Sequence, residues 1–215
     1  MARGATDGLD LADELPPASV EMPPNLHPEV LAAKLCIRMN TIIDVKEAAL
    51  RIRSGSFSAK PEHLILRFAQ CKATVKVYSS GSAILDCLGP FDSEEHSQVH
   101  ARRVTQLLIQ VLQGSFPELV LDARAITAEK FSIKVQWELP NSFRFEELAT
   151  KWPRNILYNP EVCAHLLFRV PCEAEDVKLT FRLSVTGKLC VETPTIFIAT
   201  DAVQKLYGIL VECGG

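Results

Sequence analysis

Two six-residue segments of the chain are nearly identical: residues 63–68 are HLILRF and residues 165–170 are HLLFRV. A strand-like segment follows each copy and is succeeded by a turn that carries a glycine, Gly81 in the first half and Gly187 in the second. Self-similarity at a fixed spacing is the mark of a repeated structural unit. The sequence therefore predicts an internal duplication of a unit of roughly ninety residues.

The first unit alternates between the periodicity of strands and that of helices. Asp44 and Glu47 form a capping box before a short helix over 44–53, and Asp92 and Glu95 form another before a long amphipathic helix that ends at Gly114. Strand-like segments, the last two joined by a hairpin, lie at 31–39, 63–69, 73–79 and 83–87.

The second unit follows the same order. A short helix is expected at 142–149, and Thr193 with Pro194 predicts the cap and the first turn of a final helix. Strands are expected at 131–139, 164–170, 177–185 and 188–192. Each unit thus combines a sheet with a helix that has one apolar stripe, which favours an α+β fold with helices on a single side of an antiparallel sheet.

Residues 1–28 differ from the rest in composition. They are acidic, contain two Pro-Pro pairs and have no apolar periodicity, which predicts a disordered tail before units at 29–118 and 119–215. The tail holds a single arginine, Arg3, against Asp7, Asp10, Asp13, Glu14 and Glu21. The remainder is nearly neutral, so any nucleic-acid binding must come from a local patch rather than from overall charge.

Several classes of protein lack support in the sequence. No segment has the length of a membrane span or the pattern of a signal peptide, so we expect no membrane partner and an intracellular chain. The seven cysteines form no CxxC pair, which is typical of reduced thiols. His96 and His100 have a spacing that suits a metal, but no third ligand accompanies them.

Catalysis is equally unsupported. The chain has no Gly-rich phosphate loop, no GxSxG elbow and no pairing of nucleophile and base, so we expect no catalytic residue, cofactor, metal or small-molecule substrate. No motif in the sequence supports the hypothesis of an enzyme with its active site on the open face of the sheet.

The ordered motifs of the chain resemble those of the TATA-box-binding protein family over about residues 31–211. They are IDVKEAALRIRSGSF at 43–57, LRF and VKVYSSG within 66–81, SEEHSQVHARR at 93–103, LYNPEV at 157–162, LFRV at 167–170, SVTGK at 184–188 and KLYGIL at 205–210. The resemblance implies a pseudo-twofold saddle with a curved ten-stranded antiparallel sheet and helices on the convex face. It also implies a nuclear protein whose concave face lies on the minor groove of promoter DNA.

Family members kink the duplex with phenylalanine wedges, and the resemblance places the corresponding positions at Pro61 beside Glu62, at Tyr78, at Cys163 and at Ser184. None of them is phenylalanine. Tyr78 keeps a ring that can stack, although its hydroxyl would need a partner between bases. We therefore expect duplex contact without wedging.

The floor of the concave face is also altered. Counting by two along the strands places Lys76 and Arg182 on the concave side, and Lys34 and Lys134 stand where the family carries valine. The paired asparagines that the family uses at the dyad correspond to Ala32 and Ser132. A charged floor cannot press on base edges, but it can neutralise phosphate or bind an acidic partner.

The resemblance further assigns phosphate contacts to Arg67, Arg169 and Lys188, whereas two threonines that serve the backbone in the family are replaced by Asp86 and Glu192. A carboxylate near phosphate is repelled, so this exchange in both halves argues against the usual docking. The alternative is a solvated charged face with no ligand. The candidate nucleic-acid-binding residues are Lys34, Arg67, Lys76, Tyr78, Lys134, Arg169, Arg182 and Lys188.

A candidate partner site lies in the second unit. The loop LYNPEV resembles the one that touches transcription factor IIB, and Tyr158, Pro160 and Glu161 match it, with Asn159 in place of a glutamate. Its counterpart at 54–62 would flank the factor IIA side. Alternatively, Tyr158 and Pro160 only shape a turn.

These observations lead to two hypotheses. The first is a TATA-box-binding-protein-related factor that assembles IIA- and IIB-like partners at promoters, with weak or phosphate-only DNA binding. The second is a protein-interaction saddle that has no DNA role and competes for initiation factors.

Overall fold

The structure is a computed structural model of the 215-residue chain, and it describes residues 20–121, 124, 126–140, 143–172 and 177–213. Both halves have the same order of elements: a long strand, a short helix, four strands and a long helix. In the first half these are β1 (Glu29–Arg38), α1 (Val45–Arg51), β2 (Gly55–Ala59), β3 (Glu62–Phe68), β4 (Ala73–Tyr78), β5 (Ser82–Phe91) and α2 (Glu94–Ser115), with a 3₁₀ turn at Ala69–Cys71. In the second half they are β6 (Thr127–Glu138), α3 (Phe145–Lys151), β7 (Ile156–Leu157), β8 (His165–Cys172), β9 (Val177–Ser184), β10 (Lys188–Thr193) and α4 (Ile196–Cys213).

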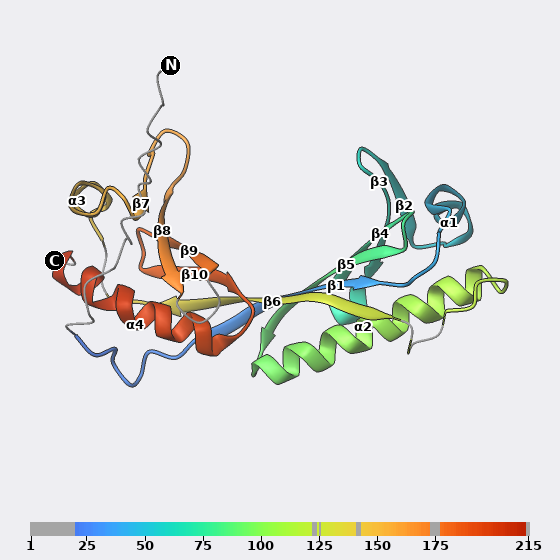
Figure 1. Ribbon diagram of the computed structural model, residues 1–215, viewed down its shortest axis with the longest axis horizontal. Coiled ribbons are helices and arrows are strands. Elements are labelled where there is room, and N and C mark those ends of the chain that lie inside the picture. Colours follow the sequence, from blue (N-terminus) through green and yellow to red (C-terminus); the bar gives the residue numbers. More distant parts are fainter. Residues whose placement is uncertain (1–19, 122–123, 125, 141–142, 173–176, 214–215) are drawn as a thin grey trace, which may run out of the picture.

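All the strands join one ten-stranded sheet in the order β2-β3-β4-β5-β1-β6-β10-β9-β8-β7, and every pairing is antiparallel. The sheet curves so that its two ends rise, while α2 and α4 lie along the opposite side (Figure 1). The predicted α+β saddle with helices on the convex face is confirmed.

The two halves meet where β1 pairs with β6. Ala33 is opposite Ile133, and on either side of this pair Ala32 is opposite Lys134 and Lys34 is opposite Ser132. The register thus places matching positions of the two repeats symmetrically around the centre of the sheet, and the pseudo-twofold axis runs through the Ala33–Ile133 pair.

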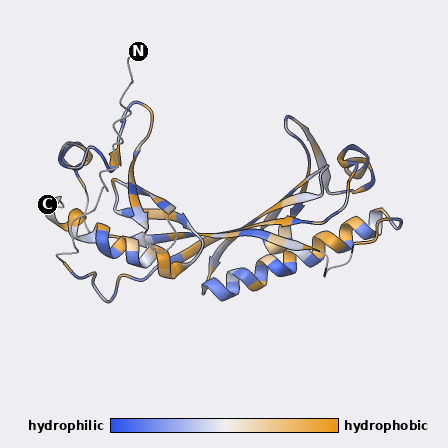
Figure 2. Cartoon of the chain, in the orientation of Figure 1, coloured by the Kyte–Doolittle hydropathy of each residue, from blue (hydrophilic) through white to orange (hydrophobic). Residues whose placement is uncertain are grey.

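Alternation along the strands gives the sheet one covered face and one open face. On β1, Leu35 and Ile37 are buried against the helices, whereas Lys34 and Cys36 point to the other side and are only partly covered. Both colours of the hydropathy scale recur along α2 and α4, as expected for helices with one buried stripe (Figure 2). The core therefore lies between the helices and the convex face, and the concave face has no covering layer among the described residues.

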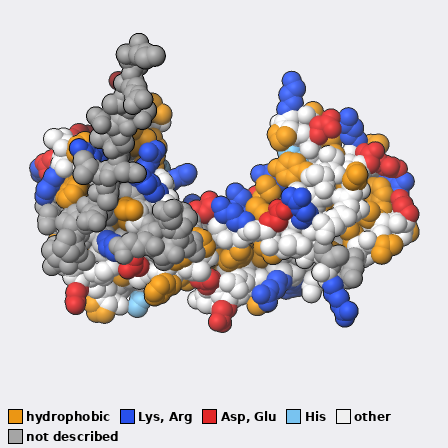
Figure 3. All heavy atoms as spheres, in the orientation of Figure 1, with side chains coloured by type: hydrophobic (Ala, Val, Ile, Leu, Met, Phe, Trp, Pro, Cys, Tyr) orange, Lys and Arg blue, Asp and Glu red, His pale blue; other side chains and the backbone are white. Residues whose placement is uncertain are grey.

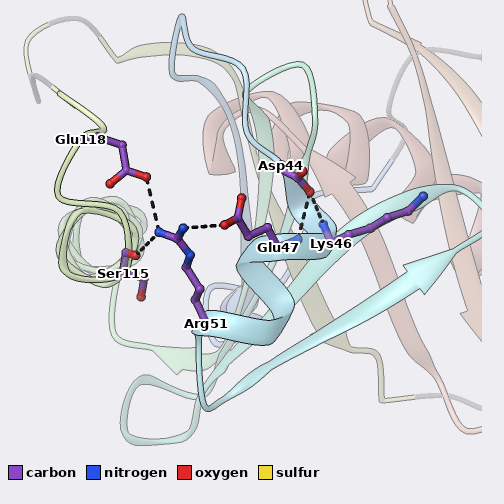
Figure 4. Close-up of polar contacts among 6 residues, drawn as sticks. All are labelled: Asp44, Lys46, Glu47, Arg51, Ser115 and Glu118. Carbon is purple, nitrogen blue, oxygen red and sulfur yellow. Dashed lines mark hydrogen bonds and ion pairs between the residues drawn. The ribbon is translucent and has the colours of Figure 1, made fainter.

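The first predicted helix cap is confirmed, and side-chain contacts fasten that helix to its neighbour. The Asp44 carboxylate accepts hydrogen bonds from the backbone N–H groups of Lys46 (3.0 Å) and Glu47 (2.9 Å). At the other end of α1, Arg51 pairs with Glu47, donates to the carbonyl of Ser115 (3.2 Å) and lies 3.4 Å from Glu118 (Figure 4). These contacts hold α1 against the end of α2.

The starts of the other three helices differ from the prediction. Helix α3 begins at Phe145 rather than at residue 142, and Arg144 at its N-cap makes no side-chain cap hydrogen bond. Ser93, not Asp92, caps α2, because its hydroxyl accepts from the backbone of His96 at 3.1 Å. The helix also continues through Gly114 to Ser115. Before α4, the Thr195 hydroxyl accepts from the backbone N–H of Ile198 at 3.3 Å, whereas Thr193 still belongs to β10. The hydroxyl groups of Ser93 and Thr195 determine where α2 and α4 begin. The spacing of residue types in the sequence does not show which hydroxyl makes the cap.

Residues at the start of the chain also differ from expectation in part. Most of the predicted tail, residues 1–19, lies outside the described residues. Between residue 20 and β1, however, the carbonyl of Val20 accepts from the Gln204 side chain (3.1 Å), and the backbone N–H of Met22 donates to the same amide (3.2 Å). Val20 and Met22 also pack on the core, so contact with the folded part begins before residue 28.

Candidate nucleic-acid interface

The eight candidate nucleic-acid-binding residues all lie on the concave face. Residues that are directly opposite in register share a face, and so do residues two apart on one strand. One continuous row of opposed residues crosses the first half and the centre of the sheet: Arg67, Thr74, Asp86, Lys34 and Ser132. Lys76 and Tyr78 extend that face along β4, and Lys134 extends it along β6.

The second half shares the same face. Lys134 is opposite Glu192, Cys190 is opposite Arg182, and Thr180 is opposite Arg169. Lys188 lies on the same face two residues before Cys190. The structure therefore brings Lys34, Lys76, Lys134 and Arg182 together on the open side of the saddle, and Figure 3 shows Lys and Arg side chains gathered where the molecule is hollowed between its raised ends.

A lysine faces a carboxylate at symmetric places in the two halves, Lys34 opposite Asp86 and Lys134 opposite Glu192. The two carboxylates nevertheless have different partners. Asp86 pairs with Lys76 at 3.6 Å, whereas Glu192 accepts a hydrogen bond of 2.8 Å from the hydroxyl of Ser132. The position that matches Ser132 in the first half is Ala32, which has no hydroxyl to donate.

The remaining candidate cations lie toward the two ends of the face. Arg67 and Arg169 are exposed on β3 and β8, in symmetric places. Lys188 is also exposed, and its ammonium lies 3.4 Å from the Glu138 carboxylate. An exposed ion pair of this kind contributes little to stability and opens readily for another anion.

The positions that correspond to wedges present no protruding ring. Tyr78 is half-buried, and its ring centroid lies 5.5 Å from that of His63, the residue opposite it in register. The Ser184 hydroxyl is used within its own hairpin, where it accepts from the backbone of Lys188 at 3.0 Å. Pro61 is exposed at the turn between β2 and β3, and Cys163 is half-buried. The concave face thus offers charged side chains to a ligand, and its wedge positions have no protruding ring that could insert between bases.

The second half of the concave face contains a groove of about 640 Å³ across β6, β10 and β9. Its charged lining residues are Lys130, Lys134, Lys178, Arg182 and Glu192. Lys130 and Lys178 were missed by the sequence analysis, although the same count by two from Lys134 and Arg182 reaches both.

Cys190 lies in the floor of this groove. Burial raises the pKa of its thiol above the ordinary value, while Lys134, Lys188 and Arg182 act in the opposite direction. The thiol donates to the side-chain oxygen of Gln136 at 3.3 Å. Burial outweighs the three cations, so the thiol stays protonated near neutral pH.

The candidate partner loop is held by two interactions. The Tyr158 ring packs edge-on against Phe145 of α3, with centroids 5.2 Å apart, and the Asn159 side chain accepts from the backbone N–H of Glu161 at 3.0 Å. Pro160 and Glu161 are exposed, and Val162 beside them is 81% exposed. Tyr158 thus anchors the loop, which presents Pro160, Glu161 and Val162 to solvent.

The predicted loop at 54–62 contains strand β2, which pairs with β3. Like β7 in the second half, it is a short edge strand that alternation in the sequence did not reveal. Phe57 on β2 is 37% exposed and lies beneath the ammonium of Lys46, which is 5.7 Å from its ring centroid.

His96 and His100 have separate structural roles. His96 pairs with Asp92 at 3.2 Å, and a ring nitrogen of His100 lies 2.8 Å from the carbonyl oxygen of Cys71. Within the described residues, no three His, Cys, Asp or Glu side chains are grouped as metal ligands would be. None of the described helices is long and apolar enough to span a membrane.

Comparisons with known proteins agree with this architecture. No protein-family model matches the chain. It is 24% identical over 79% of its length to "TATA box-binding protein-like 1" of Caenorhabditis elegans, and this match spans only 32% of the nematode protein. It is 26% identical over 72% of its length to the zebrafish (Danio rerio) protein of the same name, and 23% identical over 86% to "TATA-box-binding protein" of Tetrahymena thermophila; these matches cover 76% and 70% of the relatives.

The fold also matches a solved structure. "Methanococcus jannaschii TBP" superposes with a TM-score of 0.62 over 86% of this chain and 99% of that one, at 15% sequence identity. At that identity the match establishes the fold alone.

Proposed function

We propose that this chain, a divergent relative of the TATA-box-binding proteins, acts in the nucleus as a transcription-initiation factor. In this proposal it assembles partner factors on promoter DNA and contacts the duplex through phosphate, without wedging bases apart. It carries out no catalysis. The 29–118 and 119–215 repeats act as the two halves of one binding surface.

The composition of the concave face is the observation that most supports phosphate contact without wedging. Lys34, Lys76, Lys134 and Arg182 share the open side of the sheet, and the positions that correspond to wedges are Pro61, Tyr78, Cys163 and Ser184. Intercalating side chains unstack bases to bend the duplex. A surface that has cations and no protruding ring gains instead from the release of counterions at phosphate, which is independent of base sequence.

Partner assembly rests on the loop at 157–162. Its exposed Pro160, Glu161 and Val162 form a small surface that Tyr158 fixes against α3. An exposed turn that an aromatic side chain anchors from beneath suits a contact with a IIB-like factor. The edge strand β2 offers a separate surface on the IIA side.

The second candidate function is a protein-interaction saddle with no DNA role. Asp86 and Glu192 favour it, because each places a carboxylate on the face that would have to approach phosphate. In this case the concave face would take a protein partner and compete with assembly at promoters.

Reconstitution with purified components separates the two functions. The chain is mixed with a labelled duplex and with purified IIA- and IIB-like factors, and complexes are resolved by native gel. We expect a ternary complex of chain, duplex and IIB-like factor, and we expect Glu161→Arg to remove the factor while leaving the duplex bound. Factor binding in the absence of any duplex binding would establish the second function, and no binding of either would overturn both.

A further inference from the structure

The two halves of the concave face are equivalent in fold but unequal in free positive charge. In the first half, the carboxylate of Asp86 takes Lys76 as its partner at 3.6 Å. In the second half, Glu192 is held by the hydroxyl of Ser132 at 2.8 Å and does not pair with a cation among the described residues. Ser132 stands at the position that matches Ala32 of the first half. The two halves thus differ in which charged groups remain available to a ligand.

The groove of the second half therefore has an excess of cations. Lys130, Lys134, Lys178 and Arg182 line it together with the single carboxylate of Glu192, and none of the four cations has a carboxylate oxygen within 4.0 Å in the described part of the chain. All four are exposed, and all four lie on strands, β6 or β9, rather than on loops. Strand positions hold their charges more rigidly, so less entropy is lost when a ligand binds.

The spacing of these cations suits a long anion. Lys130 and Lys134 lie on β6, and Lys178 and Arg182 lie on β9, with β10 between the two strands. Neighbouring strands are about 4.8 Å apart and residues rise about 3.3 Å along a strand, so the pairs form two rows roughly 10 Å apart, each about 13 Å long. Along one strand of DNA, phosphates recur at about 3.4 Å of axial rise, and 13 Å spans about four of them.

An acidic peptide fits these observations less well. Extended peptides are commonly bound by hydrogen bonds to the free edge of a sheet. Here β6, β10 and β9 are all internal strands, paired on both sides, and offer no free edge. Recognition of a phosphodiester backbone depends mainly on charge and needs no such edge.

We infer that the groove formed by Lys130, Lys134, Lys178 and Arg182 is the principal phosphate-binding site of the concave face, and that the first repeat contributes little to duplex binding. This inference rests on the proposed function for its ligand. It adds two residues, Lys130 and Lys178, and an asymmetry between the repeats that neither the fold nor the relatives imply.

Matched double substitutions test the asymmetry. The second-repeat variant is Lys134→Gln/Arg182→Gln, and the first-repeat variant is Lys34→Gln/Lys76→Gln. Both variants lose two positive charges, at symmetric positions of the two repeats. Each protein is titrated with a fluorescent 20-base-pair duplex at four salt concentrations. We expect the second-repeat variant to bind about tenfold more weakly and to reduce the slope of log K against log salt by about 2, and the first-repeat variant to lose less than about threefold.

Two further variants complete the design. The variant Lys130→Gln/Lys178→Gln should lose about as much duplex affinity as Lys134→Gln/Arg182→Gln. The control Arg102→Gln/Arg103→Gln, on the exposed side of α2, should bind the duplex as the wild type does. Thermal melts establish that all variants are folded. As an independent readout, the duplex should slow the alkylation of Cys190, which lies in the groove floor.

The outcomes separate this inference from the proposed function. An equal loss from both repeats, or a larger loss from the first, overturns the asymmetry while leaving duplex binding intact. If the wild type binds no duplex even at 50 mM salt, both the inference and the DNA part of the proposed function are wrong. A parallel titration with a poly-glutamate peptide identifies the groove as a peptide site if it binds more tightly than the duplex, which also overturns the inference.

Discussion

The Ser132 hydroxyl donates a 2.8 Å hydrogen bond to the Glu192 carboxylate, across the join between β6 and β10. The hydroxyl is the hydrogen-bond partner of this carboxylate, which makes no ion pair with a cation among the described residues. The first repeat has Ala32 at the matching place, and there Asp86 is paired with Lys76. This hydroxyl is therefore one of the differences between the two halves of the concave face, beside Lys130 and Lys178 in the groove of the second half.

Ser132→Ala should make the second repeat resemble the first. Without the hydroxyl, Glu192 can pair with Lys134, which is opposite it in register. We expect duplex binding to weaken about threefold, with a less steep salt dependence, because one cation fewer is available to phosphate. The reciprocal change Ala32→Ser should strengthen binding by freeing Lys76. Titrations that give unchanged affinity for both variants would show that the hydroxyl has no such role.

The hairpin glycine Gly81 should tolerate no side chain. Its φ is +80°, and a Cβ at this position would lie 2.1 Å from the carbonyl oxygen of Thr41. We expect Gly81→Ala to lower the free energy of unfolding by roughly 2 to 4 kcal/mol, since backbone strain and a clash add together.

Gly114 provides the matched control for that substitution. It lies within α2, and nothing would come within 4 Å of its added Cβ. Gly114→Ala should raise the free energy of unfolding by about 0.5 to 1 kcal/mol through helix propensity. Urea denaturation measures both changes, and equal effects at the two positions would contradict the described backbone.

Glu94 should couple the two repeats. It lies in the first turn of α2, yet its carboxylate accepts a hydrogen bond of 2.9 Å from the backbone N–H of Ile196, at the start of α4. We expect Glu94→Ala to cost about 1 kcal/mol, because it removes a cap from an otherwise unsatisfied N–H. Glu95→Ala removes the same charge from the first turn of α2 and should cost clearly less. Comparable losses in chemical denaturation would exclude the contact as a stabilising one.

The free energy of unfolding should depend on the ionisation of Cys87. Burial, with a smaller contribution from Asp86, raises the pKa of this thiol to about 11. In the unfolded chain the thiol ionises near its ordinary value of about 8.5. The protonated form is thus favoured by folding, and this stabilisation is complete below pH 8.5 and is lost progressively as pH rises toward 11.

Denaturation at pH 8 and pH 10.5 measures this effect by comparing the wild type with Cys87→Ala. We expect the wild type to lose roughly 2 kcal/mol more than the variant over this interval, since the variant lacks the group. The difference between the two proteins removes the contribution of other titrating groups. Parallel pH profiles would mean that Cys87 is not held protonated by the fold.

Much of the architecture followed from the sequence. Repetition of HLILRF and HLLFRV indicated the duplication, and alternation within strands such as 73–79 identified which side chains share a face. Short edge strands such as β2 and β7 were missed because a few residues of alternation cannot be distinguished from a loop. Helix starts were displaced by one to three residues. Several hydroxyl and carboxylate side chains compete for the caps of α2 and α4, and α3 has no side-chain cap.

The charge balance of the concave face could be predicted only in part. Counting by two found Lys76 and Arg182, and the family resemblance pointed to Lys34 and Lys134, but neither could reveal which carboxylate pairs with which cation. That depends on the register between strands far apart in the chain, which brings Ser132 to Glu192. Cross-strand register is not encoded in the spacing of residues along one strand.

Duplex selectivity and bending reveal how the open face of the sheet meets DNA. A duplex containing a TATA sequence and a scrambled duplex of the same composition, each labelled at both ends for energy transfer, are titrated with the chain at several salt concentrations. We predict similar affinities for the two, a steep loss of binding with salt and no change in end-to-end distance. Tight binding confined to the TATA duplex and accompanied by bending would contradict the claim that charge has replaced the wedges.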